Sequence, residues 1–191
     1  MSDRDIISGN TALKSKPKEI KGESVVFEGE TYYKISNYNS MRPFFMSVVS
    51  DSNHWMFISS NGGLSAGRKN AQYAIFPYYT DDKITESSEI TGSKTIIRVK
   101  NKSDFEVWEP FSIRNTDKYD VTCNLYKSVH GNKIIFEEVN NDLNLTFSYQ
   151  WASSNLYGFV RSSSLKNHGA LTVELEVLDG IHQITALRSP K

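Results

Sequence analysis

The sequence predicts an all-β fold, an antiparallel sandwich of two packed sheets, and three observations predict it. Short runs of β-branched and aromatic residues recur along the chain, and most are separated by Gly, Asn or Asp turns. Apolar and polar residues alternate in the second half, as in strands with one buried face. Only one short segment favours a helix, so two packed sheets are the expected architecture.

The first half of the chain predicts two hairpins. Glu28–Glu30 separates the first two β-rich runs, and the polar segment 51–54 separates the next two. The four strands are expected at 25–27, 31–36, 44–50 and 55–60. Residues 69–75 contain fair helix formers and stop before Phe76 and Pro77, so they predict two helical turns at most.

The second half shows the clearest strand pattern. Between 143 and 151, five apolar residues alternate strictly with Asn144, Thr146, Ser148 and Gln150. Side chains two residues apart share one face of a strand, so the five apolar groups form a buried stripe that includes Trp151. Further strands are expected at 95–99, 121–126, 133–139, 157–164 and 171–177.

The domain organisation follows from these strands. One β-sandwich domain is expected at 23–180, after a flexible polar leader at 1–22 and before a polar tail at 181–191. The amino-terminal region lacks the apolar core of a signal peptide, and no run of 18 apolar residues occurs. A cytoplasmic location is therefore expected.

Charge and ligand-type residues exclude several function classes. Lys plus Arg and Asp plus Glu balance at 22 each, which argues against a nucleic-acid or membrane partner. The four histidines are widely spaced, and Cys123 is the only cysteine, so neither a metal nor a cofactor is expected.

Catalytic motifs are also lacking. No serine lies in a G-x-S-x-G turn. The strand pattern places the acids of the later strands on exposed faces, where a solvated surface is the expected role. They are Glu137, Glu138, Glu174 and Glu176. No catalytic residue is therefore assigned.

Aromatic and polar residues gather between positions 55 and 82. Sugar rings stack on aromatic planes, and amides, carboxylates and arginine bond their hydroxyls, so this mixture suits a carbohydrate or a contact with another domain. Trp108 is a further stacking candidate. The candidate contact residues are Trp55, Asn61, Gly62, Gly63, Arg68, Asn70, Tyr78, Tyr79, Asp81 and Asp82.

The same segment resembles the amino-terminal domain of cellobiose-phosphorylase-like glycoside phosphorylases and hydrolases. The matching pieces are FISSNGGL at 57–64, RKN at 68–70, YAIFPYYTDD at 73–82 and, later, ELEVLDG at 174–180. The resemblance implies a galactose-mutarotase-like supersandwich, which could be incomplete in this chain. In that family a helical barrel follows and holds the general acid and the phosphate site. No such residue can be carried over here.

Function hypotheses of three classes follow. The first is a non-catalytic carbohydrate-binding accessory domain that contacts a catalytic helical barrel and shapes its saccharide site. The second is a stand-alone sugar-modifying enzyme of mutarotase or epimerase type, and the third is a sandwich used only for protein contacts. The expected partners are an oligosaccharide and the barrel domain, with homo-oligomers through unpaired sheet edges as a further option.

Overall fold

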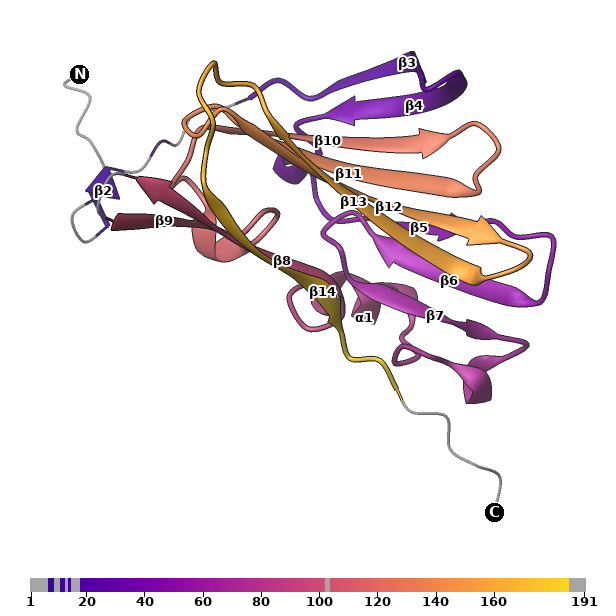
Figure 1. Cartoon of the computed structure of the whole chain (residues 1–191). Helices are drawn as coiled ribbons and strands as arrows, with labels where there is room; N and C mark the ends of the chain where they lie inside the picture. Colours follow the sequence, from indigo (N-terminus) through magenta and orange to yellow (C-terminus); the bar gives the residue numbers. More distant parts are fainter. Residues whose placement is uncertain (1–6, 9–10, 13, 15–17, 102–103, 186–191) are drawn as a thin grey trace.

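The computed structural model describes residues 7–8, 11–12, 14, 18–101 and 104–185, and it confirms the all-β sandwich (Figure 1). The largest sheet has six antiparallel strands in the order β13-β12-β11-β10-β4-β3. Its strands are β3 (Lys21–Phe27), β4 (Glu30–Ser36), β10 (Val121–Ser128), β11 (Lys133–Asn140), β12 (Leu145–Ser154) and β13 (Gly158–Asn167).

Two three-stranded antiparallel sheets form the second layer. One has the order β14-β8-β9, with β8 (Gly92–Asn101), β9 (Asp104–Trp108) and β14 (Leu175–His182). The other has the order β5-β6-β7, with β5 (Phe45–Val48), β6 (His54–Ser59) and β7 (Leu64–Arg68). The short strands β1 (Ile7–Ser8) and β2 (Thr11–Ala12) pair with each other.

In the part of the chain that the structure describes, helical structure is confined to short connections. The elements are η1 (Tyr38–Ser40), η2 (Ala71–Tyr73), η3 (Ile113–Asn115) and α1 (Asp81–Glu86). The helix predicted at 69–75 is only the single turn η2, because Ala74 returns to the sheet by bridging Gly67. Helix α1 was not predicted from the sequence, because its six residues are too few to show a helical period.

The ends of the sandwich lie close to the predicted boundaries. β3 begins at Lys21, within the predicted leader, and β14 ends at His182, within the predicted tail. Most of the leader and residues 186–191 of the tail lie outside the described residues. The strand predicted at 171–177 is shifted, because pairing with β8 begins at Leu175 and continues to His182.

The core confirms the period-two stripe from Leu145 to Trp151, whereas Leu143 lies in the preceding turn and is only partly buried. Leu145, Phe147, Tyr149 and Trp151 of β12 are all at most 4% exposed. The Tyr149 ring stacks on Phe136 of the neighbouring strand β11, with centroids 4.9 Å apart. One cluster of buried side chains joins this stripe to both smaller sheets, so the inner face of the six-stranded sheet anchors the whole sandwich.

A buried carboxylate ties the layers together. Glu138 is 5% exposed, which corrects the prediction that it lies on a solvated face. Its Oε1 accepts a hydrogen bond from the Trp108 indole of β9 at 2.7 Å, and its Oε2 accepts one from the Phe111 backbone at 2.7 Å. Burial raises the pKa of Glu138, while these bonds oppose the rise. Trp108 is fully buried, so its predicted stacking role is also wrong.

An ion pair closes the edge of the sandwich. Arg161 of β13 donates two hydrogen bonds to Asp179 of β14, at 2.7 and 2.8 Å. Thr95 and Ser163 also donate to this carboxylate. Burial of Asp179 opposes the shift, but the bonds from Arg161, Thr95 and Ser163 lower its pKa from 3.8 to about 2. The pair links the six-stranded sheet to β14.

Replacing Glu138 with glutamine should destabilise the fold by about 2–4 kcal/mol, because an amide nitrogen then faces a buried N–H donor. Urea unfolding measures the change. Glu137→Gln, on the opposite face of the same strand, is the matched control and should cost less than about 1 kcal/mol. Equal effects of the two substitutions would contradict the buried clamp.

The contribution of Asp179 should depend on pH. Its folded pKa is lowered, so its stabilisation is full above the ordinary value of 3.8 and is lost as pH falls toward about 2. Wild type should therefore exceed Asp179→Asn in unfolding free energy by about 1–2 kcal/mol at pH 6, and the gap should shrink by pH 2.5. A gap that stays constant between these pH values would refute the assignment.

Candidate functional site

The turn predicted to shape a binding loop is held from within. Asn61 accepts a hydrogen bond from the Ser59 hydroxyl and donates from Nδ2 to the Thr85 carbonyl at 2.8 Å. Gly62 has a φ of +91°. A Cβ on Gly63 would lie 2.2 Å from the Ile84 carbonyl oxygen. Asn61 and Gly63 therefore join the β6–β7 turn to α1, and Gly62 supplies the positive φ of the turn.

Two other predicted residues have local partners. The Arg68 guanidinium donates to Asn53 Oδ1 at 3.2 and 3.3 Å, across the β6–β7 hairpin. Asn70 caps η2 by accepting from the Gln72 backbone N–H at 3.0 Å. Both side chains are exposed, so their remaining polar atoms face solvent.

The residues around α1 show no convergent polar site. The Tyr79 backbone N–H donates to Ser65 Oγ at 3.3 Å. Asp82 is exposed and accepts from the Thr80 hydroxyl, which lowers the pKa of Asp82. Asp81 is the first residue of α1, and its side chain lies outside the described part of the structure.

Two of the predicted residues do meet, on what we call the outer aromatic surface: Phe45, Trp55, Phe57 and Tyr78. The Trp55 and Tyr78 rings contact edge to face, with centroids 5.8 Å apart. Phe57 lies between Trp55 and Phe45, at centroid distances of 5.8 and 6.2 Å. Tyr78 is 56% exposed. The contact role predicted for Trp55 and Tyr78 from the sequence therefore stays a prediction, and this surface is where it would act.

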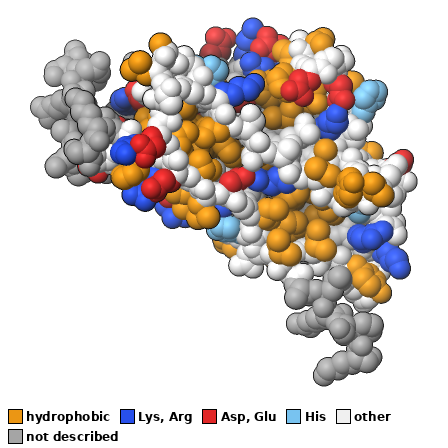
Figure 2. Space-filling view, viewed as in Figure 1, with side chains coloured by type: hydrophobic (Ala, Val, Ile, Leu, Met, Phe, Trp, Pro, Cys, Tyr) orange, Lys and Arg blue, Asp and Glu red, His pale blue; other side chains and the backbone are white. Residues whose placement is uncertain are grey.

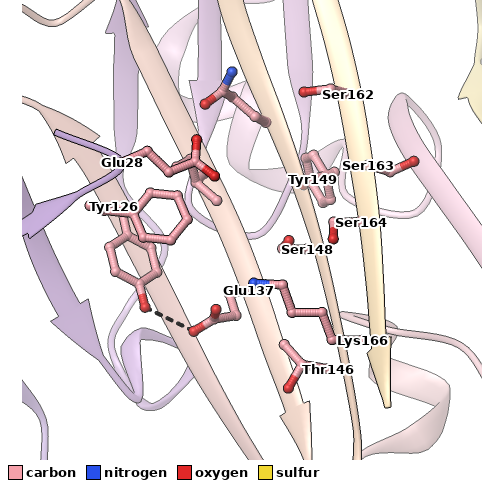
Figure 3. Close-up of a pocket in the computed structure, with 13 residues that line it drawn as sticks. Glu28, Tyr126, Glu137, Thr146, Ser148, Tyr149, Ser162, Ser163, Ser164 and Lys166 are labelled. Atoms are coloured by element: carbon pink, nitrogen blue, oxygen red, sulfur yellow. Dashed lines mark hydrogen bonds between the residues drawn. The ribbon is translucent and has the colours of Figure 1, made fainter. Parts of the chain in front are cut away.

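A second candidate lies on the other layer, on the open face of the six-stranded sheet (Figure 3). We call this pocket of about 190 Å³ the open-face groove. Strand register builds it in rows that cross β11, β12 and β13: Ile135–Gln150–Ser162, Glu137–Ser148–Ser164 and Val139–Thr146–Lys166. Because every second residue points to this face, the buried stripe of β12 dictates the polar row opposite it.

The floor of the groove is closed and its walls are polar. Ile135 and Thr146 are 8% and 6% exposed, although they lie on the open face. By contrast, four uncharged polar side chains of the lining make no hydrogen bond to any described residue. They are Ser148, Gln150, Ser162 and Ser164. Hydroxyl and amide groups supply both donors and acceptors, so the groove can bond a ligand rich in hydroxyls.

A carboxylate marks the middle of the groove. Tyr126 and Asn124 both donate to Glu137 Oε1, each at 2.8 Å, and Figure 3 shows the Tyr126 bond. Oε2 has no hydrogen bond within the described chain. Burial and the bond to Glu137 raise the pKa of Tyr126, so its phenol stays protonated and fixes the carboxylate.

Aromatic rings form one wall. The Phe27 ring lies 6.3 Å from the Tyr126 ring, and Phe27 is 38% exposed. Glu28, beside Phe27 in the β3–β4 turn, points toward the groove from this side, and Lys166 enters from β13 opposite (Figure 3). The groove thus combines ring surface, one cation and two carboxylates.

The lining of the groove offers hydroxyl, amide and carboxylate groups and one ammonium group. The described lining residues include no histidine or cysteine. Within the described residues no three His, Cys, Asp or Glu side chains come together as a metal site would require. Among the described helices none has the length and apolar character needed to cross a membrane.

This groove was not predicted from the sequence. Alternation placed Thr146, Ser148 and Gln150 on the polar face of their strand, but the serines at 162–164 had no predicted role beyond the strand expected at 157–164. The available signal was the register of three consecutive antiparallel strands, which brings the polar faces of β11, β12 and β13 together.

Comparison with known proteins adds no family. No protein-family model matches the chain, and no curated protein sequence matches it. The resemblance to the cellobiose-phosphorylase-like domain therefore stays a prediction.

Replacing Gly63 with alanine should destabilise the β6–β7 turn. The new Cβ would clash with the Ile84 carbonyl, and we expect a loss of about 2–4 kcal/mol. Gly180→Ala is the control, since a Cβ added there would meet nothing within 4 Å. Thermal unfolding compares the two, and similar melting temperatures would refute the close approach of α1.

Proposed function

We propose that this domain is a non-catalytic carbohydrate-binding accessory module whose saccharide site is the open-face groove. The observation that carries the proposal is the set of four unbonded polar side chains beside an aromatic wall. Ser148, Gln150, Ser162 and Ser164 offer donors and acceptors at the spacing of adjacent strands, which is roughly 4.7–4.9 Å. A sugar presents hydroxyls around a ring with apolar faces. The hydroxyls can bond the polar side chains of the groove, and the ring face can pack on its aromatic wall.

The size of the groove limits what it encloses. Its volume of about 190 Å³ is below the roughly 300–1,000 Å³ of pockets that enclose drug-sized ligands. The groove has room for one sugar ring, and the neighbouring rings of a longer saccharide would lie along the sheet. An oligosaccharide is therefore the proposed ligand.

The accessory role rests on the outer aromatic surface. Exposed rings such as Tyr78 and Phe45 are typical anchors of protein contacts, since aromatic residues are enriched at interfaces. We assign this surface to contact with a second folded domain. A helical-barrel catalytic domain is the candidate that the sequence resemblance implies.

Titration with cello- and laminari-oligosaccharides tests the proposal. Isothermal calorimetry should detect binding by wild type, and Gln150→Ala combined with Ser164→Ala should weaken it about tenfold. Two lost hydrogen bonds of about 0.5–1.5 kcal/mol each give that scale.

The controls separate the two surfaces. Tyr78→Ala alters the outer aromatic surface alone and should leave the affinity unchanged. A loss with Tyr78→Ala, and none with the groove variant, would move the site to the 55–82 segment. Binding of no saccharide would refute the proposal. Polarimetric anomerisation above the buffer rate would favour the stand-alone enzyme instead.

A further inference from the structure

The inner face of the six-stranded sheet is not fully covered. Large apolar side chains stay at the surface of the molecule in several patches (Figure 2). On β3 and β4, Val26 is 75% exposed and Tyr33 is 58% exposed, although both lie on the face that packs the core farther along the sheet. The covering sheet therefore stops at its edge strand β5.

A groove of about 360 Å³ lies at this border, and we call it the edge groove. Tyr33 and Ile35 of β4 and Leu125 of β10 form its base, and Phe44 and Met46 form the side toward β5. The remaining lining residues are Lys127, Ser128, Val129 and Gly131. The base is apolar, and it occupies the position that a strand next to β5 would cover.

The edge of β5 has backbone groups to offer. The Phe44 carbonyl accepts from the Ser60 N–H at 2.7 Å, which sets the phase of the β5–β6 ladder. Antiparallel ladders alternate, so the N–H and C=O groups of Phe45 and Ser47 point away from β6. In the described part of the chain no strand pairs with this side of β5. The Val49 N–H, at the end of the same edge, donates to the Gly131 carbonyl at 2.8 Å, so the open part of the edge is at Phe45 and Ser47. Such an edge is a template for one more strand.

Lys127 gives the groove its charge. Its side chain lines the apolar base, and burial lowers the pKa of its ammonium group. No hydrogen bond or ion pair joins Lys127 to any described residue, and the lining holds no carboxylate. A half-buried cation without an acceptor is costly, so a carboxylate brought by a ligand would be stabilised here.

We propose that the edge groove binds an extended polypeptide segment of a partner, which pairs with β5 as an added strand. The segment carries apolar side chains at alternate positions, which cover Tyr33 and Ile35. One position on the same face carries a carboxylate, which meets Lys127. Main-chain pairing supplies affinity, and the alternate side chains supply selectivity, as in other strand-addition complexes.

The unpaired backbone groups of β5 favour a peptide strand over other ligands of the edge groove. A fatty acid also has an apolar body and a carboxylate, but it would leave the N–H and C=O groups of Phe45 and Ser47 unpaired. The edge groove and the open-face groove lie on opposite faces of the six-stranded sheet. This proposal is therefore independent of saccharide binding.

Fluorescence anisotropy with two labelled nine-residue peptides tests the inference. In the first peptide, threonine alternates with three valines and one glutamate, so these four side chains share a face. The second has glutamine in place of glutamate. Wild type should bind the glutamate peptide about tenfold more tightly, the scale of one charge-assisted hydrogen bond.

Two variants locate the site. Lys127→Met keeps the apolar stem and should remove the preference for glutamate. Ser47→Pro deletes an N–H that points away from β6, so the sandwich keeps its ladder while both peptides lose binding. Lys83→Met, at an exposed side chain of α1, is the control and should change neither affinity. Circular dichroism checks that each variant is folded.

Several results would overturn the inference. They are equal affinities for the two peptides in wild type, no binding at millimolar peptide, and unchanged affinity in Ser47→Pro. A fourth such result could come from light scattering, which measures the oligomeric state of the protein without peptide. A wild-type dimer that Lys127→Met converts to a monomer would make a second copy of the chain the occupant, and not a partner segment.

Discussion

The structure depends on one constraint, the two-residue period of the strands in the six-stranded sheet. In β12 this period sends Leu145, Phe147, Tyr149 and Trp151 into the core. Burial of such large apolar groups is the main favourable term in folding, at roughly 1.5–3 kcal/mol for each side chain of this kind. A shift of register by one residue would expose the whole stripe, so the pairing is strongly specified.

The same constraint creates both candidate surfaces. Fixing the buried stripe of β12 places Thr146, Ser148 and Gln150 on the opposite face, where register aligns them with Ser162 and Ser164. The open-face groove therefore lies on the face of these strands opposite the buried stripe. The edge groove arises where the stripe face continues beyond the covering sheet, so an apolar base remains beside a free strand edge.

Polar groups join the layers where apolar packing alone would not set their position. Glu138 receives the indole of Trp108 and the backbone N–H of Phe111, which has a φ of 64°. A positive φ is unfavourable for a bulky residue, and the hydrogen bond and the packing of the Phe111 ring against Tyr149 at 5.3 Å hold it there. At the β13 edge of the six-stranded sheet, the ion pair between Arg161 and Asp179 also joins the two layers.

Sequence periodicity was sufficient for the fold class and for the core stripe, because alternation reports directly on one buried face. Periodicity was not sufficient for Glu138. Glu137 and Glu138 are adjacent in β11, and the sequence does not show which of the two is buried until the hydrogen-bond donors to Glu138 are known. The displaced strand β14 and the short η2 turn also depend on long-range pairing. For the candidate site, the structure brings together Trp55 and Tyr78, two of the contact residues proposed from the sequence, whereas the groove could be found only from the register of three strands.

The central claim is that the polar reverse of the core stripe is a saccharide-binding surface. Titration of the ¹⁵N-labelled domain with a cello-oligosaccharide, followed by two-dimensional NMR, tests it most directly. The account predicts shifts concentrated at residues of β11, β12 and β13 such as Glu137, Ser148 and Ser162. Shifts concentrated between Trp55 and Asp82, or no shifts at saturating sugar, would contradict it.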